Sequence, residues 1–239
     1  RANPAFILPK LKRIRYFVPF WKKVGGLIKL QQFIRKRLSL SERGYLSYNA
    51  MVKHCPDADC YIAGSDQIWK NANNFRYLTY VPDDKLKIAY APSFGKSEIP
   101  EKMKEEITPY LKRFDGISLR EKSGADIVKA MGFDAVHVPD PTLLLDYKQY
   151  PYNENGKSNY YFCYFLNLEG KDSVSYNEIK EIAQDDGREL VLTAPLNYYL
   201  FSKEDNVQFP SVEDWLGYYK NADCIFTNTF HGLLFCIIF

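Results

Sequence analysis

The stretch CIFTNTFHGLLFCIIF, residues 224–239, contains the pattern that decides the fold. A short apolar run, Cys224–Thr227, leads through Asn228 and Thr229 into a second apolar run that is long enough to begin a helix. An apolar strand that passes through a polar turn into a helix is the repeating unit of parallel sheets. The last residues of the chain therefore predict a strand-turn-helix unit.

The same pattern recurs along most of the chain from residue 57 onward. Short apolar runs alternate there with amphipathic stretches, which is typical of βαβ units. The first series comprises predicted strands at Cys60–Ala63, Ile88–Ala91, Gly116–Leu119 and Ala135–Val138, and predicted helices at Glu101–Leu111 and Glu121–Met131. The second series comprises predicted strands at Tyr160–Leu166, Leu190–Thr193 and Cys224–Thr227, and predicted helices at about 174–186 and about 211–220. The sequence thus predicts an α/β protein with two Rossmann-like, doubly wound domains.

The segment between the two series, residues 146–159, is rich in Tyr, Pro, Asn and Gly and is the predicted linker. It separates an N-terminal Rossmann-like domain, residues 57–145, from a C-terminal one, residues 160–239. Residues 1–56 are assigned to the N-terminal domain as a basic, aromatic-rich segment. Two such domains that face a cleft would resemble the GT-B architecture of glycosyltransferases. We expect both ends to be truncated and the C-terminal domain to be incomplete, because the chain lacks an initial methionine and stops inside an apolar run.

Positive charge is concentrated in the first part of the chain. The net charge is +3, yet residues 1–43 contain twelve Lys or Arg and one acidic residue, which leaves twenty basic and twenty-eight acidic residues elsewhere. The acidic remainder argues against nucleic acid as the main partner. Apolar residues alternate with the cations of the segment, which predicts peripheral contact with an anionic membrane at its cytoplasmic, inner face. The competing interpretation is a pair of basic helices packed on their own domain.

The composition indicates a folded protein of a reducing compartment. With 46% hydrophobic residues a disordered chain is excluded, and no apolar run approaches the roughly 20 residues of a membrane span. Five cysteines without a Cys-x-x-Cys pair favour the cytoplasm over a disulfide framework. His54, Cys55 and Cys60 would make only half of a zinc site, so no metal is predicted.

Polar residues follow several predicted strands, at the edge where ligands bind in such sheets. Arg120 follows one strand, and its planar guanidinium suits bidentate binding of a phosphate or carboxylate. The alternative for Arg120 is a salt bridge to Glu121 or to a helix carboxylate. His231 falls in the first turn of the last helix, where backbone N–H groups favour an anion, and an ordinary histidine pKa of about 6.5 suits proton transfer. The other candidates for substrate contact are Ser65, Asp66, Ser93, Gly95, Asp140, Thr227, Asn228, Thr229 and Gly232.

Structural roles compete with binding for several of these residues. Ser65 and Asp66 either contact an acceptor or cap a helix. Nearby, Trp69 and Phe94 either stack on sugar rings or pack in the core. A lone histidine such as His231 is more often structural than catalytic, so its surroundings decide its role.

Five motifs, in this order, resemble the landmarks of polysaccharide pyruvyl transferases. Each motif is weak alone, but five with compatible spacing are specific. The resemblance extends from about residue 58 to the end of the chain. The five motifs are Gly64–Trp69, Ala89–Gly95, Ser118–Glu121 with Gly124, Asp140–Thr142 and Phe230–Gly232.

This resemblance implies a transferase that moves the enolpyruvyl group of phosphoenolpyruvate onto two sugar hydroxyls and forms a pyruvate ketal. The acceptor would be a bacterial surface polysaccharide, such as an exopolysaccharide or capsule, or its precursor. The resemblance implies Arg120 as the residue that holds the donor and His231 as the catalytic acid or base, with no cofactor and no metal. The partners implied are phosphoenolpyruvate and a glycan, and oligomerisation stays open.

One position departs from the pattern of the family. In several members an arginine stands two residues before the histidine, at the position of Thr229 in this sequence. A threonine donates hydrogen bonds to phosphate but carries no charge. Two competing functions therefore stay open, a GT-B glycosyltransferase that uses a nucleotide sugar and a non-catalytic homologue.

Overall fold

The structure is a computed structural model that describes residues 17–154, 156–201, 204 and 206–239, with side chains from residue 21 onward. The chain divides into two compact units. The first unit comprises Ser41–Leu145, and the second comprises the residues up to Leu40 together with Asp146–Phe239. Residues 1–16 of the basic segment lie outside the described residues.

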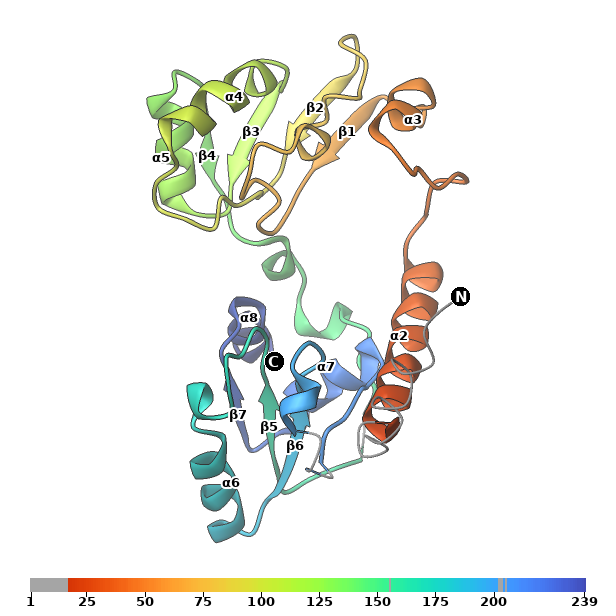
Figure 1. The fold of residues 1–239 in the computed structure, drawn as a ribbon, viewed down its shortest axis with the longest axis vertical. Helices are drawn as coiled ribbons and strands as arrows, with labels where there is room; N and C mark the ends of the chain where they lie inside the picture. The colour runs from red at the N-terminus through yellow and green to blue at the C-terminus, as the bar shows by residue number, and fades with distance from the viewer. Residues whose placement is uncertain (1–16, 155, 202–203, 205) are drawn as a thin grey trace, which may run out of the picture. The chain divides into compact units, whose positions relative to one another are not determined.

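The first unit is built on a four-stranded sheet in which all strands are parallel (Figure 1). Neighbouring strands follow the chain order β1-β2-β3-β4. The strands are β1 (Cys60–Ala63), β2 (Leu86–Ala89), β3 (Gly116–Leu119) and β4 (Val136–His137), and the helices are α3 (Tyr48–Lys53), α4 (Glu101–Leu111) and α5 (Lys122–Ala130). All four predicted strands are present, and β2 lies two residues earlier than predicted.

Apolar residues at helical spacing hold α4 and α5 against this sheet. Ile107 and Leu111 lie one turn apart on α4, and both are buried. Gly124, Ala125 and Val128 are the buried residues of α5, and their small side chains bring this helix close to the sheet. Burial of one large aliphatic side chain contributes roughly 1.5–3 kcal/mol.

Trp69 is the largest side chain in the core of the first unit. It is 0% exposed, and its ring stacks on that of Tyr77 with 4.8 Å between the ring centroids. Its indole N–H donates to the Arg76 carbonyl at 3.3 Å. Phe94 is 1% exposed and packs against the same indole. Trp69 and Phe94 are therefore core residues, and the interpretation that they stack on sugar rings is wrong.

The second unit contains a three-stranded parallel sheet in the order β6-β5-β7. The strands are β5 (Tyr160–Tyr164), β6 (Glu189–Thr193) and β7 (Cys224–Thr227), and the helices are α2 (Phe17–Arg37), α6 (Tyr176–Asp185), α7 (Val212–Asn221) and α8 (Phe230–Ile238). At the start of α7 the Asp214 N–H donates to Ser211 Oγ at 3.1 Å, and the two residues form a capping box. The predicted strands and helices of this series are confirmed within two residues.

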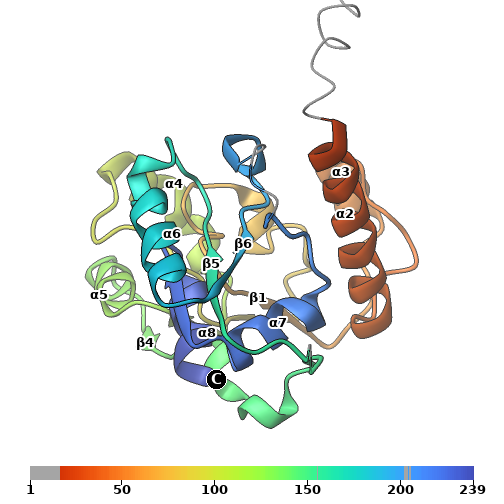
Figure 2. The same cartoon turned by 90° about the horizontal axis from the view of Figure 1, so that it is seen from below.

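Successive side chains of β5 pack on opposite faces of the second sheet. Cys163 shares a buried cluster with Tyr176 of α6, whereas Phe162 shares another with Leu216 of α7 and Phe235 of α8. Figure 2 shows α6 on one side of the sheet and α7 and α8 on the other. The connections that follow β5 and β7 therefore leave toward opposite faces. In open α/β sheets this arrangement creates a ligand crevice at the carboxyl ends of the strands.

Helix α2 belongs to the second unit, which differs from the assignment of residues 1–56 to the N-terminal domain. Gly26 packs so closely on Phe209 that a Cβ at this glycine would lie 2.8 Å from Phe209 Cβ. The domain against which a basic helix packs depends on residues far away in the sequence. The composition of residues 1–56 alone therefore does not specify it. In the described part of the chain, no helix is both long and apolar enough to cross a membrane.

The predicted linker, residues 146–159, also belongs to the second unit. Tyr150 packs edge-on against Phe235, with 5.5 Å between the ring centroids. Lys220 Nζ lies 4.1 Å from the centroid of the Tyr152 ring. These aromatic side chains make the segment part of the fold rather than a free tether.

Candidate active site

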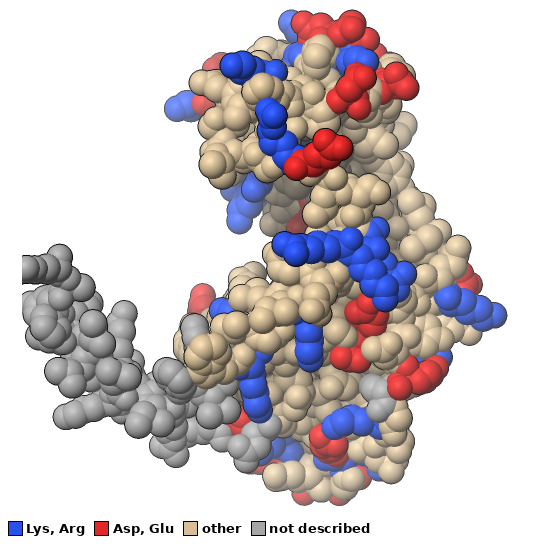
Figure 3. All heavy atoms as spheres, turned by 90° about the vertical axis from the view of Figure 1, so that its right-hand side faces the viewer, with Lys and Arg blue, Asp and Glu red and all other residues tan. Residues whose placement is uncertain are grey.

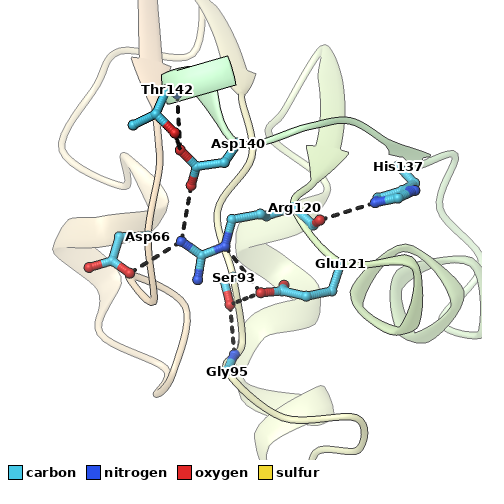
Figure 4. Close-up of polar contacts among 8 residues, drawn as sticks. All are labelled: Asp66, Ser93, Gly95, Arg120, Glu121, His137, Asp140 and Thr142. Carbon is cyan, nitrogen blue, oxygen red and sulfur yellow. Dashed lines mark hydrogen bonds and ion pairs between the residues drawn. The ribbon is translucent and has the colours of Figure 1, made fainter. Parts of the chain in front are cut away.

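Arg120 follows β3 and gathers carboxylates from neighbouring strand ends of the first unit (Figure 4). Its Nη1 lies 3.3 Å from Asp66 Oδ1 and 3.2 Å from Asp140 Oδ2, and its Nε lies 3.2 Å from Glu121 Oε1. The Arg120 side chain is 5% exposed. The salt bridge to Glu121 that was an alternative for Arg120 is therefore present, together with two further ion pairs.

Asp140 fixes the turn that follows β4. Its side chain is 1% exposed and accepts hydrogen bonds from the Thr142 N–H at 3.0 Å and the Thr142 hydroxyl at 2.8 Å. It thereby caps the short 3-10 helix Pro141–Leu144. His137, the last residue of β4, has its ring Nε2 3.1 Å from the Arg120 carbonyl oxygen, so this histidine has a structural partner.

The turn after β2 adds Ser93 and Gly95 to the same cluster. The Ser93 hydroxyl donates to Glu121 Oε1 at 2.6 Å and accepts from the Gly95 N–H at 2.8 Å. Gly95 has a φ of 66°, and a Cβ there would lie 2.7 Å from Gln67 Cδ. The turn consequently requires glycine at this position. Ser93 is positioned as a bridge between the turn and Glu121.

Asp66 is the accessible member of the cluster. Its carboxylate is 66% exposed, and its backbone has a φ of 64°, which is uncommon for a residue other than glycine. The backbone carbonyl of Asp66 accepts from the Ser93 N–H at 2.8 Å, which ties the turn after β1 to the turn after β2. Ser65 lies in the same turn, and neither residue caps one of the described helices.

The charge of this cluster is unbalanced. One guanidinium faces the carboxylates of Asp66, Glu121 and Asp140. Burial alone would lower the pKa of Arg120, but its hydrogen bonds to Glu121 and Asp140 outweigh that effect and the pKa is raised. Of the three carboxylates, that of Asp66 has most access to solvent, so it is the one that an anionic ligand at Arg120 would displace most readily.

In the second unit, the turn between β7 and α8 contains the other candidates. The Thr227 hydroxyl donates to the Tyr164 carbonyl at 2.9 Å. The Thr229 hydroxyl accepts from the Gly232 N–H at 2.8 Å and caps α8. The Asn228 side chain accepts from the Leu166 N–H at 3.0 Å and donates to the Leu166 carbonyl at 2.7 Å. These three polar side chains build the turn.

Gly232 allows the first turn of α8 to close on this turn. A Cβ at Gly232 would overlap the hydroxyl oxygens of both Thr227 and Thr229. The sequence shows Thr229 where an arginine stands in several family members, and the structure shows what the threonine does there. It holds the N-terminus of the helix that carries the histidine.

His231 lies in the first turn of α8, as the sequence predicts. Its ring is half-buried and meets the ring of Phe230 edge-on at 5.2 Å. The backbone N–H groups of a helix N-terminus and the helix dipole favour an anion beside this ring. The position combines a group that transfers protons with a setting that suits a phosphate or carboxylate.

Sequence reasoning missed two features of these sites. Two of the three carboxylates around Arg120, those of Asp66 and Asp140, come from distant turns, and no local pattern joins them to Arg120. A cavity beside α2, at the carboxyl ends of β5 and β6, was also missed because α2 was assigned to the other domain. Among the described residues, no group of three or more His, Cys, Asp or Glu is arranged to hold a metal ion.

The fold and these strand-end clusters define a Rossmann-like α/β protein of the kind that binds small substrates at the carboxyl edge of a parallel sheet. The family model for polysaccharide pyruvyl transferase matches residues 3–239, so the chain belongs to this family and its members act as pyruvyl transferases in polysaccharide biosynthesis. The match begins well before residue 58, where the resemblance of the motifs begins. No curated protein and no solved structure matches the chain significantly.

Proposed function

We propose that this protein transfers the enolpyruvyl group of phosphoenolpyruvate onto two hydroxyls of a sugar in a bacterial surface polysaccharide or its precursor. The product is a cyclic pyruvate ketal, and the second product is inorganic phosphate. The observation that supports this most strongly is the position of His231 in the first turn of α8, within the range that the family model matches.

The proposed reaction transfers one proton to C3 of phosphoenolpyruvate and releases phosphate from C2 as the leaving group. A sugar hydroxyl adds to C2 of the enol phosphate while C3 takes a proton and becomes a methyl group. A second hydroxyl then displaces phosphate from C2, and the two hydroxyl protons balance the proton on C3 and the proton taken by phosphate. No oxidant or reductant is required by this balance.

His231 is proposed to move the proton. A general acid or base positioned on the reacting atoms contributes roughly 10²- to 10⁴-fold to the rate. The N-terminus of α8 attracts the negative charge of the donor toward the same ring. Thr227, Asn228, Thr229 and Gly232 act through the shape of the turn. The Thr227 and Asn228 side chains tie it to the backbone of Tyr164 and Leu166, and the Thr229 hydroxyl accepts from the Gly232 N–H.

Arg120 is proposed to bind the donor by exchanging the exposed carboxylate of Asp66 for a phosphate or carboxylate oxygen. Asp140 and Glu121 stay in place and hold the guanidinium plane. Ser93 and Gly95 fix Glu121 from the adjacent turn. This role predicts a change in donor affinity rather than in the chemical step when the guanidinium is altered.

The experiment offers phosphoenolpyruvate and nucleotide sugars side by side with a panel of bacterial glycans and measures the release of phosphate and of nucleotide. Release of phosphate with formation of a pyruvylated glycan supports the proposal, and release of nucleotide alone refutes it. The family match does not favour the nucleotide-sugar alternative.

One matched pair of variants tests the role of Arg120. Arg120→Lys keeps the positive charge but loses the planar guanidinium that can bind an anion through two N–H groups. The KM for phosphoenolpyruvate should therefore rise while kcat changes little. The matched control is Arg113→Lys in the same unit, since Arg113 pairs with Asp83 rather than with the strand-end cluster. An equal effect of both substitutions would show that Arg120 does not contact the donor.

A further inference from the structure

Helix α2 exposes an unusual set of side chains. Trp21, Leu27 and Ile28 are 57%, 52% and 53% exposed. The helix has no acidic residue between Phe17 and Arg37, and its last turn is Arg35-Lys36-Arg37. Figure 3 shows Lys and Arg side chains among uncharged ones on the face of the molecule that it presents, with Asp and Glu side chains beside some of them. Exposed apolar groups at this density on one element mark an interaction site.

A cavity of about 470 Å³ lies between α2 and the carboxyl ends of β5 and β6. This volume falls within the range of about 300–1,000 Å³ that is usual for sites of small ligands. The lining is almost entirely apolar, and the cation Lys23 takes part in it. The principal lining residues are Lys23, Leu27, Leu30, Leu166, Leu196 and Trp215.

We propose that this cavity takes one acyl chain of an anionic lipid and that the lysines of α2 hold the lipid head group. The inference is independent of the transfer reaction. Lys23 Nζ lies 4.8 Å from the centroid of the Tyr198 ring, which places a cation beside an apolar cavity. Lys22 and Lys29 are exposed on the same helix. An apolar lining next to the cations of α2 is complementary to an amphiphile with a negative head group. A neutral or zwitterionic amphiphile would match the apolar lining but not the positive charge.

This mode of binding has two quantitative consequences. Each methylene group buried in the cavity should tighten binding by a factor of about four, which corresponds to about 0.8 kcal/mol. Each lysine near the head group should contribute a factor of roughly five at low ionic strength, and that factor should shrink as salt screens the charges. Chain length and salt therefore report separately on the cavity and on the lysines.

The experiment uses the full chain and calorimetry with monomeric decanoate and dodecanoate, each below its micelle concentration. Dodecanoate has two more methylene groups and should bind about fifteenfold more tightly. Leu30→Trp fills the cavity and should abolish this preference. Ile28→Trp is the matched control, because Ile28 is an equally apolar, exposed residue of α2 that does not line the cavity. Melting curves of both variants establish that they are folded.

Sedimentation with vesicles supplies the second arm. Vesicles that contain phosphatidylglycerol should bind the protein, vesicles of phosphatidylcholine alone should not, and Lys22→Gln with Lys23→Gln should weaken binding by at least tenfold. Equal binding of the two fatty acids, equal effects of Leu30→Trp and Ile28→Trp, or equal binding to both vesicle types would overturn the proposal. So would a dimer through α2 in the absence of any lipid binding. These binding measurements do not depend on the transfer reaction, so they test the lipid proposal even if the protein releases no phosphate from phosphoenolpyruvate.

Discussion

Replacement of Arg120 by alanine should destabilise the first unit by about 3–5 kcal/mol, since it removes a guanidinium that is ion-paired with the buried Asp140 carboxylate. The Arg120 and Asp140 side chains are 5% and 1% exposed, and Nη1 and Oδ2 are 3.2 Å apart. The Thr142 donors remain in the variant, but they do not neutralise the charge. A loss of this size is a large part of the roughly 5–15 kcal/mol that stabilises a typical domain.

The assay is urea unfolding followed by the fluorescence of Trp69, which is fully buried in the first unit. Trp21→Phe and Trp215→Phe remove the other two tryptophans, so the signal reports on this unit alone. Adding Asp140→Asn to the Arg120→Ala variant should recover part of the loss, because the neutral amide is less costly to bury.

A more exposed ion pair of the same unit serves as the control for the loss of stability in Arg120→Ala. Lys85→Ala removes an ion pair with Asp57 whose side chains are 27% and 96% exposed, and it should cost much less than Arg120→Ala because solvent screens this pair. A cost for Arg120→Ala that is no larger than for Lys85→Ala would refute the view that Arg120 neutralises a buried carboxylate. So would the absence of any recovery with Asp140→Asn.

The pH dependence of the Arg120→Ala variant has a defined sign. Loss of the positive charge of Arg120 raises the pKa of the Asp140 carboxyl in the folded variant above its value in the folded native protein, so the folded variant binds more protons than the native protein does. The penalty should therefore be greatest near neutral pH and should shrink as the pH falls through the raised pKa. A penalty that is independent of pH would indicate that lost packing, rather than the buried charge, explains the destabilisation.

Two further outcomes follow from the second unit. Gly232→Ala should destabilise it by more than 1 kcal/mol, because the new methyl group overlaps the Thr227 and Thr229 hydroxyls, and circular dichroism melting measures the loss. For Glu204, burial would raise the pKa, but the hydrogen bonds from Lys171 and Lys180 outweigh burial and lower it. Glu204→Gln should therefore destabilise the protein at pH 7, and the difference should vanish as the pH falls below the lowered pKa of Glu204.

The strand ends could be predicted from the sequence because each βα unit is a local pattern. The motif at Phe230–Gly232 placed His231 in the first turn of a helix, and the apolar run before Arg120 placed that residue after a strand. Both positions are confirmed. What the sequence could not predict is the set of partners that these side chains find across the fold.

The carboxylates around Arg120 show why. Asp66 lies 54 residues before Arg120 and Asp140 lies 20 residues after it, and only the parallel order of four strands brings them together. The same limit applies to α2. Its composition predicts a basic helix, whereas its packing against Phe209 depends on a segment far along the chain.

The most direct test of a pyruvyl transferase is the reaction of phosphoenolpyruvate with an accepted glycan in deuterated water. We predict equal amounts of phosphate and pyruvate ketal, with one solvent deuterium in the methyl group of the ketal. His231→Ala should lower turnover by roughly 10²- to 10⁴-fold, and His54→Ala, at an exposed histidine of the first unit, should not change it. Ketal formation at the wild-type rate by His231→Ala, or consumption of a nucleotide sugar with no phosphate released from phosphoenolpyruvate, would contradict the proposed chemistry.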